Sequence, residues 1–408
     1  MIEDLIEKIR KLPGFERFLL ASTEEEVKAS AAEGPLIMIN VSDYRCDALL
    51  VDPDNIRTLQ LPLLHASDVR NRLQILDSGT LDTLLLEWLW ETTAKPILDA
   101  LGLLQTPMDT WPRIWWIPGG PLARFPLHAA GYHSHGKENV LDRAISSYSS
   151  SVRSLVRSRQ NSAKSADIKK SENVVLVGMP ELSHAPREIG ILRALCKAMN
   201  LPVHEPPRLQ ENVLAALNDC KIFHFAGHGR THPLDPFQSA LILSDEELTV
   251  SRLFEANMHD RQPFLAYLSA CGTGRVKFDS LVDESLHLIA ACQLAGFKHV
   301  IGTLWEVNDR SCVDMAQLTY ERILKRNMID ESVSEGLHYA CKKLRDQWVH
   351  ENTAVRAAAG GAVMSKHEVT AQIPLELREQ SSKRRDGRDV SSCDEVPLHW
   401  VPYVHFGI

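Results

Sequence analysis

Two short segments carry residues whose types and spacing could perform covalent catalysis. In FLAYLSACGTG (264–274) an apolar run ends just before Cys271, and in IFHFAGHG (222–229) a similar run ends just before His228; glycines stand beside both residues. Reaction sites of open α/β sheets lie at the carboxyl ends of strands, where small residues let a substrate backbone approach. A thiol needs a base at neutral pH, and imidazole is the usual one. If the two strands are neighbours, His228 and Cys271 meet at one sheet edge.

The same residues also have structural interpretations. Cysteine is often a small buried hydrophobe, and the local sequence alone leaves burial and catalysis by Cys271 both open. His224, His228 and His232 repeat every four positions, which on a helix could bind zinc. However, glycines interrupt the segment, its first residues favour a strand, and no glutamate follows the first histidine as in HExxH. A zinc hydrolase is therefore the alternative enzyme, and we interpret His224 as a core histidine.

The segments at 224–229 (HFAGHG), 268–274 (LSACGTG) and 295–309 (AGFKHVIGTLWEVND) resemble the CHAT family. That family belongs to the caspase and separase group of cysteine peptidases, clan CD. HWVPYVHFG (399–407) is similar to the family's closing strand, so the resemblance extends over roughly residues 90 to 408. It implies that His228 is the base and Cys271 the nucleophile. By resemblance to caspases, the backbone N–H groups of Gly229 and Cys271 would hold the oxyanion.

The resemblance also suggests where substrate binds. Related peptidases build the pocket for the residue before the cleaved bond after the strand that ends near Trp305. The acidic side chains in that region indicate a basic substrate residue, by charge pairing. Helix capping explains the same acids equally well, above all at Asp309. The expected substrate-binding residues are Trp305, Glu306, Asn308, Asp309 and Asp283.

The elements that must position these residues alternate between strands and helices, which predicts a mainly parallel sheet flanked by helices. The expected strands lie at 174–178, 203, 222–226, 240–243, 264–268 and 300–305. The expected helices lie at 187–199, 210–218, 283–296, 309–325 and 335–348. The fold class is therefore α/β, and the resemblance implies a caspase-like sheet preceded by a non-catalytic, pseudo-caspase-like α/β half.

Composition predicts how the chain is divided. Residues 1–35 are helical in pattern, and 36–157 form the non-catalytic half, with strands at 36–41, 48–51 and 114–117 and a helical stretch at 67–101. The polar segment 158–173 is a linker, and 174–408 is the CHAT catalytic domain. Within it, 352–397 is poor in aromatic residues and reads as a disordered insertion. His128, in the first half, is interpreted as a packed histidine.

Charge and cysteine usage exclude several classes of protein. The net charge of −8 and the lack of a basic block argue against nucleic-acid binding. The eight cysteines form no CxxC pair, and we interpret them as reduced thiols. The sequence shows no signal peptide and no run of about 18 apolar residues that could span a membrane. At 131–138, GYHSHGKE places a glutamate where a phosphate loop needs a hydroxyl. We expect a soluble cytoplasmic protein without membrane or nucleotide binding.

These observations predict a cysteine endopeptidase that cleaves protein or peptide substrates through a thioester on Cys271. We expect regulation by a protein partner and no cofactor or metal. The alternative from another class is a CHAT-fold interaction module without activity. The presence of both His228 and Cys271 favours the enzyme, because a scaffold has no need of the pair.

Overall fold

A computed structural model of the chain describes most of its residues. The described residues are 2–13, 15–77, 81–133, 138–164, 171–230, 232, 235–256, 258, 261–270, 288–307, 309–358 and 398–408. Within these ranges, no helix combines the length and the apolar character that crossing a bilayer requires.

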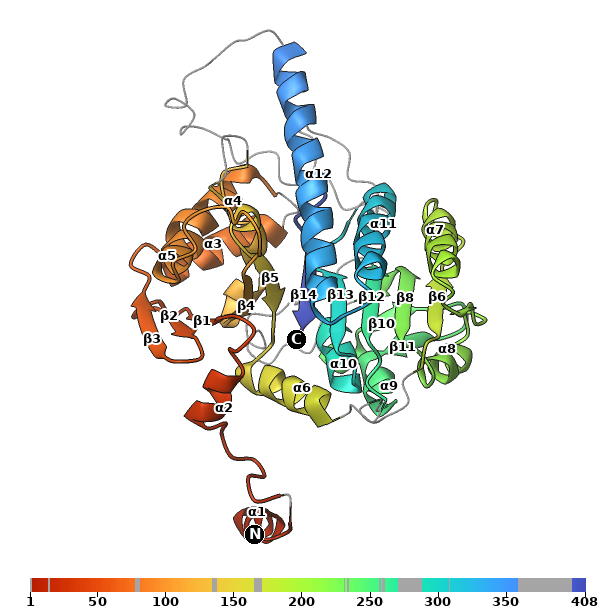
Figure 1. Ribbon diagram of the computed structural model, residues 1–408, viewed down its shortest axis with the longest axis horizontal. Coiled ribbons are helices and arrows are strands. Elements are labelled where there is room, and N and C mark those ends of the chain that lie inside the picture. Colours follow the sequence, from red (N-terminus) through yellow and green to blue (C-terminus); the bar gives the residue numbers. More distant parts are fainter. Residues whose placement is uncertain are drawn as a thin grey trace, which may run out of the picture.

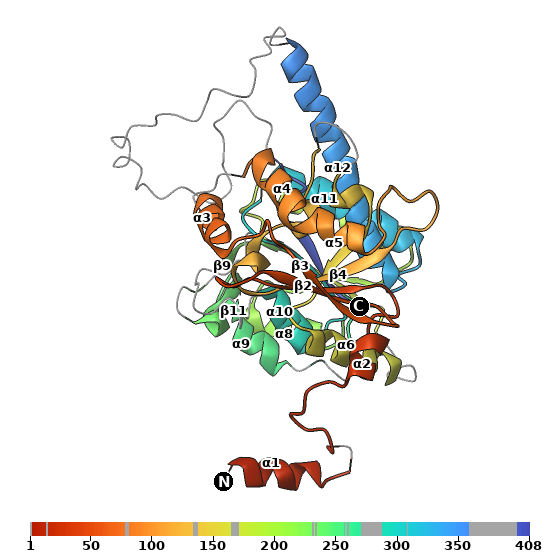
Figure 2. The ribbon, with the colours of Figure 1, turned by 90° about the vertical axis from the view of Figure 1, so that its left-hand side faces the viewer.

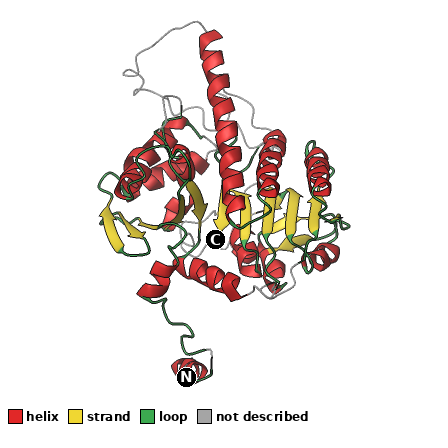
Figure 3. Cartoon of the chain, in the orientation of Figure 1, coloured by secondary structure: helices red, strands yellow, loops and turns green. Residues whose placement is uncertain are grey.

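An eleven-stranded sheet runs through the molecule and organises everything else (Figures 1 and 3). Its strands, in spatial order, are β3 (Ile56–Gln60), β2 (Asp47–Val51), β1 (Leu36–Asn40), β4 (Arg113–Pro118), β5 (Ile145–Tyr148), β14 (Tyr403–Gly407), β13 (His299–Thr303), β12 (Leu265–Ala270), β8 (Ile222–Gly227), β6 (Val174–Gly178) and β7 (Val203–His204). A separate three-stranded sheet consists of β9 (Gly229–Arg230), β10 (Ala240–Ile242) and β11 (Glu247–Thr249).

The strands that the second half contributes to the large sheet are parallel, apart from the last. Strands β6, β7, β8, β12 and β13 pair in parallel, whereas β14 is antiparallel to β13. In the first half β1, β4 and β5 are parallel, and the hairpin of β2 and β3 extends the sheet antiparallel. The central strands β8 and β12 are buried at every position, which explains their continuous apolar sequences. The mixed α/β architecture with a mainly parallel sheet is as predicted.

Helices cover both faces of the sheet (Figure 2). On one face lie α3 (Ala66–Asp77), α4 (Thr83–Leu89), α5 (Lys95–Ala100), α11 (Asp309–Lys325) and α12 (Glu331–Ala358), and α7 (Ala185–Ala198) packs against α11. On the other face lie α2 (Glu24–Ala29), α6 (Val152–Lys164), α8 (Gln210–Leu217), α9 (Val250–Glu255) and α10 (Leu288–Ala295). The helix α1 (Ile2–Arg10) lies apart from this body and buries none of its residues (Figures 1 and 2).

The two halves join at β14. This strand pairs with β13 over five residues and with β5 through Phe406 and Tyr148. A chain of buried hydrogen bonds crosses the same junction. Ser147 Oγ lies 2.8 Å from His405 Nδ1, and the Nε2 atom of His405 lies 3.1 Å from the Nδ1 atom of His299. The halves therefore share one sheet and a polar contact in its interior.

Most predicted elements exist, but several bounds differ. The strand before Cys271 extends to Ala270 rather than Leu268 because it keeps its pairing with β8 to the end. Part of the expected linker is helical, since α6 continues to Lys164. The last helix runs from Glu331 to Ala358 and so takes in 352–358 of the expected insertion; the rest of that insertion lies outside the described residues. The domain boundaries themselves stay a prediction.

Candidate functional site

The predicted site lies at the carboxyl ends of three adjacent strands, β8, β12 and β13. Strands β8 and β12 pair in parallel from Ile222 and Leu265 up to Gly227 and Ala270. His228 and Cys271 are the next residues in the chain after this last pair. Neighbouring strands lie about 4.8 Å apart, so the ends of β8 and β12 lie side by side. The neighbouring strands required by the sequence hypothesis are therefore present, although Cys271 itself lies outside the described residues.

His228 is an exposed residue on a well-anchored turn. Its backbone carbonyl accepts a hydrogen bond of 2.9 Å from Ile242 N–H, which ties it to β10. Just beyond, Arg230 Nε donates to Glu247 Oε1 at 2.7 Å and links β9 to β11. Arg230 lowers the pKa of the Glu247 carboxyl. The backbone at this position is thus anchored at the sheet edge, and His228 is exposed to solvent.

The glycines around His228 have separate physical reasons. A Cβ atom on Gly227 would come within 2.4 Å of the Phe225 ring, so packing requires the glycine. Gly229 pairs with Leu241, and the preceding pair, His228 with Ile242, is hydrogen-bonded. In an antiparallel ladder hydrogen-bonded and non-bonded pairs alternate. The N–H of Gly229 therefore points away from β10.

His224 is the core histidine that the sequence suggests. It is fully buried, its Nε2 lies 3.0 Å from Glu188 Oε1, and its Nδ1 lies 3.3 Å from the Tyr320 hydroxyl. His232 Nδ1 accepts a hydrogen bond from Asp235 N–H within the following loop. Within the described part of the chain no three potential metal ligands cluster. The geometry thus argues against the zinc alternative, since β8 is a strand and both ring nitrogens of His224 have protein partners.

The remaining described cysteines behave as structural thiols. All six are reduced and buried: Cys46, Cys196, Cys220, Cys292, Cys312 and Cys341. Burial raises the pKa of Cys196 to about 11 and that of Cys292 to about 12. Such thiols are almost entirely protonated at neutral pH and cannot act as nucleophiles.

The expected substrate-binding residues are only partly brought together. Trp305 is half-buried and Glu306 is exposed, and both follow the carboxyl end of β13 beside β12. Asp309 is the first residue of α11, and its side chain lies outside the described residues. Asp283 and Asn308 also lie outside them. The described part of this region therefore offers one carboxylate, Glu306, next to the strand end.

Sequence reasoning missed one residue at this edge. Thr303, the last residue of β13, is fully buried, and its Oγ1 donates a hydrogen bond of 3.0 Å to the carbonyl of Ala270. A hydroxyl within an apolar strand (VIGTLW) is a signal for such a contact, because a buried polar group needs a partner.

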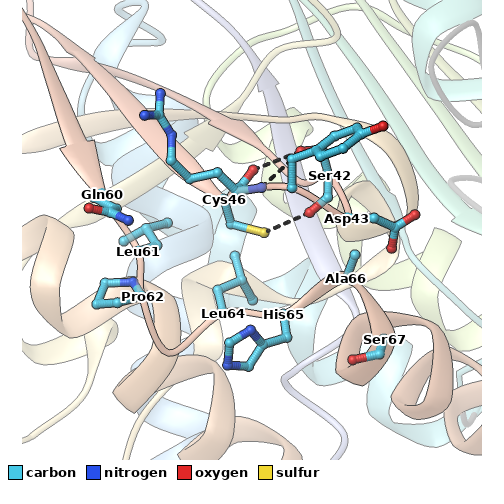
Figure 4. Close-up of a pocket in the computed structure, with 12 residues that line it drawn as sticks. Ser42, Asp43, Cys46, Gln60, Leu61, Pro62, Leu64, His65, Ala66 and Ser67 are labelled. Atoms are coloured by element: carbon cyan, nitrogen blue, oxygen red, sulfur yellow. Dashed lines mark hydrogen bonds between the residues drawn. The ribbon is translucent and has the colours of Figure 1, made fainter.

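A hollow of about 310 Å³ lies in the first half, away from these strand ends (Figure 4). It is formed by the β1–β2 connection and the segment from β3 to α3, and its lining residues are Ser42, Asp43, Tyr44, Arg45, Cys46, Gln60, Leu61, Pro62, Leu64, His65, Ala66 and Ser67. Although a thiol and an imidazole both line it, the Cys46 thiol is buried and donates to the carbonyl of Ser42. This arrangement is structural rather than catalytic.

A family model described as the CHAT domain matches residues 83–408 of the chain. The chain belongs to the CHAT domain family. The matched region includes all strands of the candidate site and most of the first half, which agrees with the resemblance seen in the sequence. No curated protein sequence matches the chain.

Several solved structures are similar to this CHAT protein, and those of separase carry the comparison of folds. Two structures of the separase–securin complex of Saccharomyces cerevisiae are similar to it, both at 10% identity. One has a TM-score of 0.57 and covers 100% of this chain and 33% of the separase chain. The other has a TM-score of 0.54 and covers 82% of this chain and 32% of the separase chain. The Arg-specific cysteine proteinase gingipain R (RgpB), of Porphyromonas gingivalis, has a TM-score of 0.43 at 11% identity, over 62% of this chain and 64% of that chain. The chain thus spans about a third of the separase chain, and the caspase-like fold class is confirmed.

Proposed function

We propose that this CHAT domain is a cysteine endopeptidase with His228 as base and Cys271 as nucleophile. One observation carries the proposal: β8 and β12 are adjacent and parallel in a register that ends at Gly227 and Ala270, directly before the two residues. The exposure of His228 supports it, because a catalytic base must reach the substrate. The fold shared with separase supports a peptidase rather than another use of the sheet edge.

The reaction follows from these groups. His228 takes the proton of the Cys271 thiol as the sulfur attacks the carbonyl carbon of the scissile peptide bond, and a C–S bond forms. His228 donates a proton to the leaving amine as the C–N bond breaks, which leaves a thioester. His228 then takes a proton from water, whose oxygen attacks the thioester carbon. The C–S bond breaks, His228 returns the proton to the Cys271 sulfur, and the product acid leaves as a carboxylate after losing its proton to solvent. The oxyanion of each step would be held by the N–H groups of Gly229 and Cys271, and the direction of the Gly229 N–H is consistent with this role.

Substrate choice and control are part of the proposal. The exposed carboxylate of Glu306 favours a basic residue before the cleaved bond, with Trp305 forming part of the same wall. Asp283, Asn308 and Asp309 remain proposed contacts. Separase is solved in complex with securin, a protein partner. We infer that a protein partner also controls the activity of this chain.

An electrophilic peptide probe tests the dyad. The full-length protein, Cys271→Ala, His228→Ala and the control Cys292→Ala are incubated with probes that carry a basic or an acidic residue at the reactive carbonyl. We expect labelling of wild type and Cys292→Ala at Cys271, faster with the basic probe, no labelling of Cys271→Ala and much slower labelling of His228→Ala. Folded wild-type protein that reacts with neither probe contradicts the proposal and favours the interaction module.

A further inference from the structure

The first helix, α1, carries an apolar stripe that the described part of the chain leaves open. The residues of the stripe stand at the spacing that places them on one side of a helix: Ile2, Leu5, Ile6, Ile9 and Leu12. Leu12 continues the series because its N–H donates to the carbonyl of Ile9 at 2.9 Å. None of the residues of α1 is buried, and the helix lies away from the sheet and the helices that cover it (Figures 1 and 2).

A helix as short as α1 needs something to pack against. Isolated helices shorter than about 12–15 residues are marginal in water, because most of the stability of a helix in a protein comes from packing of its apolar face. Helix α1 has nine residues. The segment that follows supports it at one end, where Arg10 Nε donates a hydrogen bond of 2.9 Å to the carbonyl of Phe18. This contact leaves the apolar stripe exposed.

The charges along this segment indicate what covers the stripe. The acidic residues lie toward its start, at Glu3, Asp4 and Glu7, and the basic residues toward its end, at Lys8, Arg10 and Lys11. Two such helices packed in parallel would place like charges side by side, whereas an antiparallel pair places each acidic end beside a basic end. Three acidic and three basic residues cancel, which does not suit an anionic membrane surface, since that surface attracts helices rich in lysine and arginine.

We propose that α1 is a docking helix for the α1 of a second copy of this chain, packed antiparallel through the apolar stripe. The inference goes beyond the proposed peptidase function and does not depend on it. In this pair Ile2 meets Leu12 of the second copy, and Leu5 meets Ile9 of the second copy. The two chains continue from opposite ends of the helix pair, so their bodies do not obstruct it. Two short helices bury less surface than a standard interface of about 1,600 Å², so the dimer should be reversible.

Sedimentation of the full chain over a range of concentrations tests the pairing. We expect wild type to dimerise reversibly, and Leu5→Gln to raise the dissociation constant of the dimer at least about tenfold, because each dimer then buries two leucines fewer. The matched control is Leu63→Gln: Leu63 is 60% exposed and Leu5 is 58% exposed, but Leu63 lies outside α1. This control should dimerise like wild type. Both variants should unfold in urea like wild type, because neither leucine belongs to the core.

Charge variants separate helix pairing from the effect of charge on the helix dipole, which the same distribution also suits. Glu3→Lys with Glu7→Lys makes the segment mainly basic, and Lys8→Glu with Lys11→Glu makes it mainly acidic. Each double variant alone should be monomeric, because like charges then face each other. A mixture of the two should dimerise again, which a dipole effect within each helix cannot produce.

Three outcomes overturn the inference: a wild type that stays monomeric at every concentration, a dimer that Leu5→Gln leaves intact, or a mixture of the charge variants that stays monomeric. Vesicles that contain phosphatidylserine identify the other occupant. A monomeric wild type that sediments with these vesicles, while Leu5→Gln does not, would show that α1 binds a membrane surface instead of a second copy.

Discussion

Both halves of the molecule place a histidine beyond a buried strand and near glycines, yet the two residues differ in every physical respect. In the first half β4 leads through PGGPLARFP to His128, which is buried. Its backbone N–H donates to the Tyr148 hydroxyl at 3.0 Å, and its Nδ1 lies 2.9 Å from the same oxygen. Burial lowers the pKa of His128 to about 4. In the second half His228 follows β8 directly and is exposed on a turn that β10 holds.

The difference shows what decides the role of a histidine at a strand end. His128 stays neutral near pH 7 because charging it would place an imidazolium in an apolar interior. The Nδ1 atom of His128 lies within hydrogen-bond distance of the Tyr148 hydroxyl, and the buried ring therefore contributes to the packing of the core. His228 is exposed to solvent and directly follows β8, the strand that pairs with β12. The same local sequence features thus support packing in one half and the proposed catalysis in the other.

The strongest test of this comparison replaces each histidine by glutamine. His228→Gln removes the proposed base and should lower turnover by about 10²–10⁴-fold with little change in stability, because the side chain is exposed. His128→Gln should lower stability and keep the turnover per folded molecule. Peptide hydrolysis and urea unfolding of both variants measure the two effects. Equal losses of turnover would show that the first half takes part in the chemistry.

The dependence of stability on pH provides the second test. Burial lowers the pKa values of both His128 and His133 to about 4, from 6.5. Below pH 6.5 the unfolded chain binds protons that the native state does not bind until about pH 4. The free energy of unfolding should therefore fall as the pH drops through this window, by up to ~3 kcal/mol per histidine.

Two variants test whether His133 is a source of this pH dependence of stability. His133 packs on Trp400 and is faced by Arg345, which lowers its pKa further, and by Asp142, which opposes that effect. In His133→Phe the free energy of unfolding, measured with urea, should fall less between pH 6.5 and pH 4 than it does in wild type. The exposed His65→Phe should leave it unchanged. Equal curves for wild type and His133→Phe would rule out this histidine as a source.

Local sequence was sufficient for β6, β8, β10, β12 and β13 of the second half and for α11, whose bounds match the prediction. Long apolar runs that end at glycine carry a strong signal. The strands β9 and β11 were missed because two or three residues have no periodicity of their own. The contact of Thr303 with Ala270 and the chain from Ser147 through His405 to His299 join residues far apart in sequence, so only the fold brings them together. Of the candidate site, the sequence could predict the histidine and its strand but not what supports them.

The smallest expected effect concerns the junction between the halves. Ser147→Ala removes the hydroxyl that lies 2.8 Å from His405 Nδ1 and leaves that buried ring nitrogen without this partner. An unsatisfied buried polar group costs about 1–3 kcal/mol, and the free energy of unfolding should fall by an amount near the lower end, ~1 kcal/mol. The control is Ser146→Ala, one residue earlier, whose Oγ accepts a hydrogen bond of 3.0 Å from Trp116 Nε1 within the first half.

Turnover distinguishes what the two serines do. If the junction only holds the halves together, both variants lose similar stability and keep the kcat of wild type, because neither residue approaches β8 or β12. If the first half also sets the position of the site, Ser147→Ala alone lowers kcat, since His405 lies on β14 and β14 is paired along its whole length with β13, the strand that carries Thr303. If kcat also falls in Ser146→Ala, the contact at the junction is not the cause of the lower kcat. The result would instead indicate a general loss of packing in the first half.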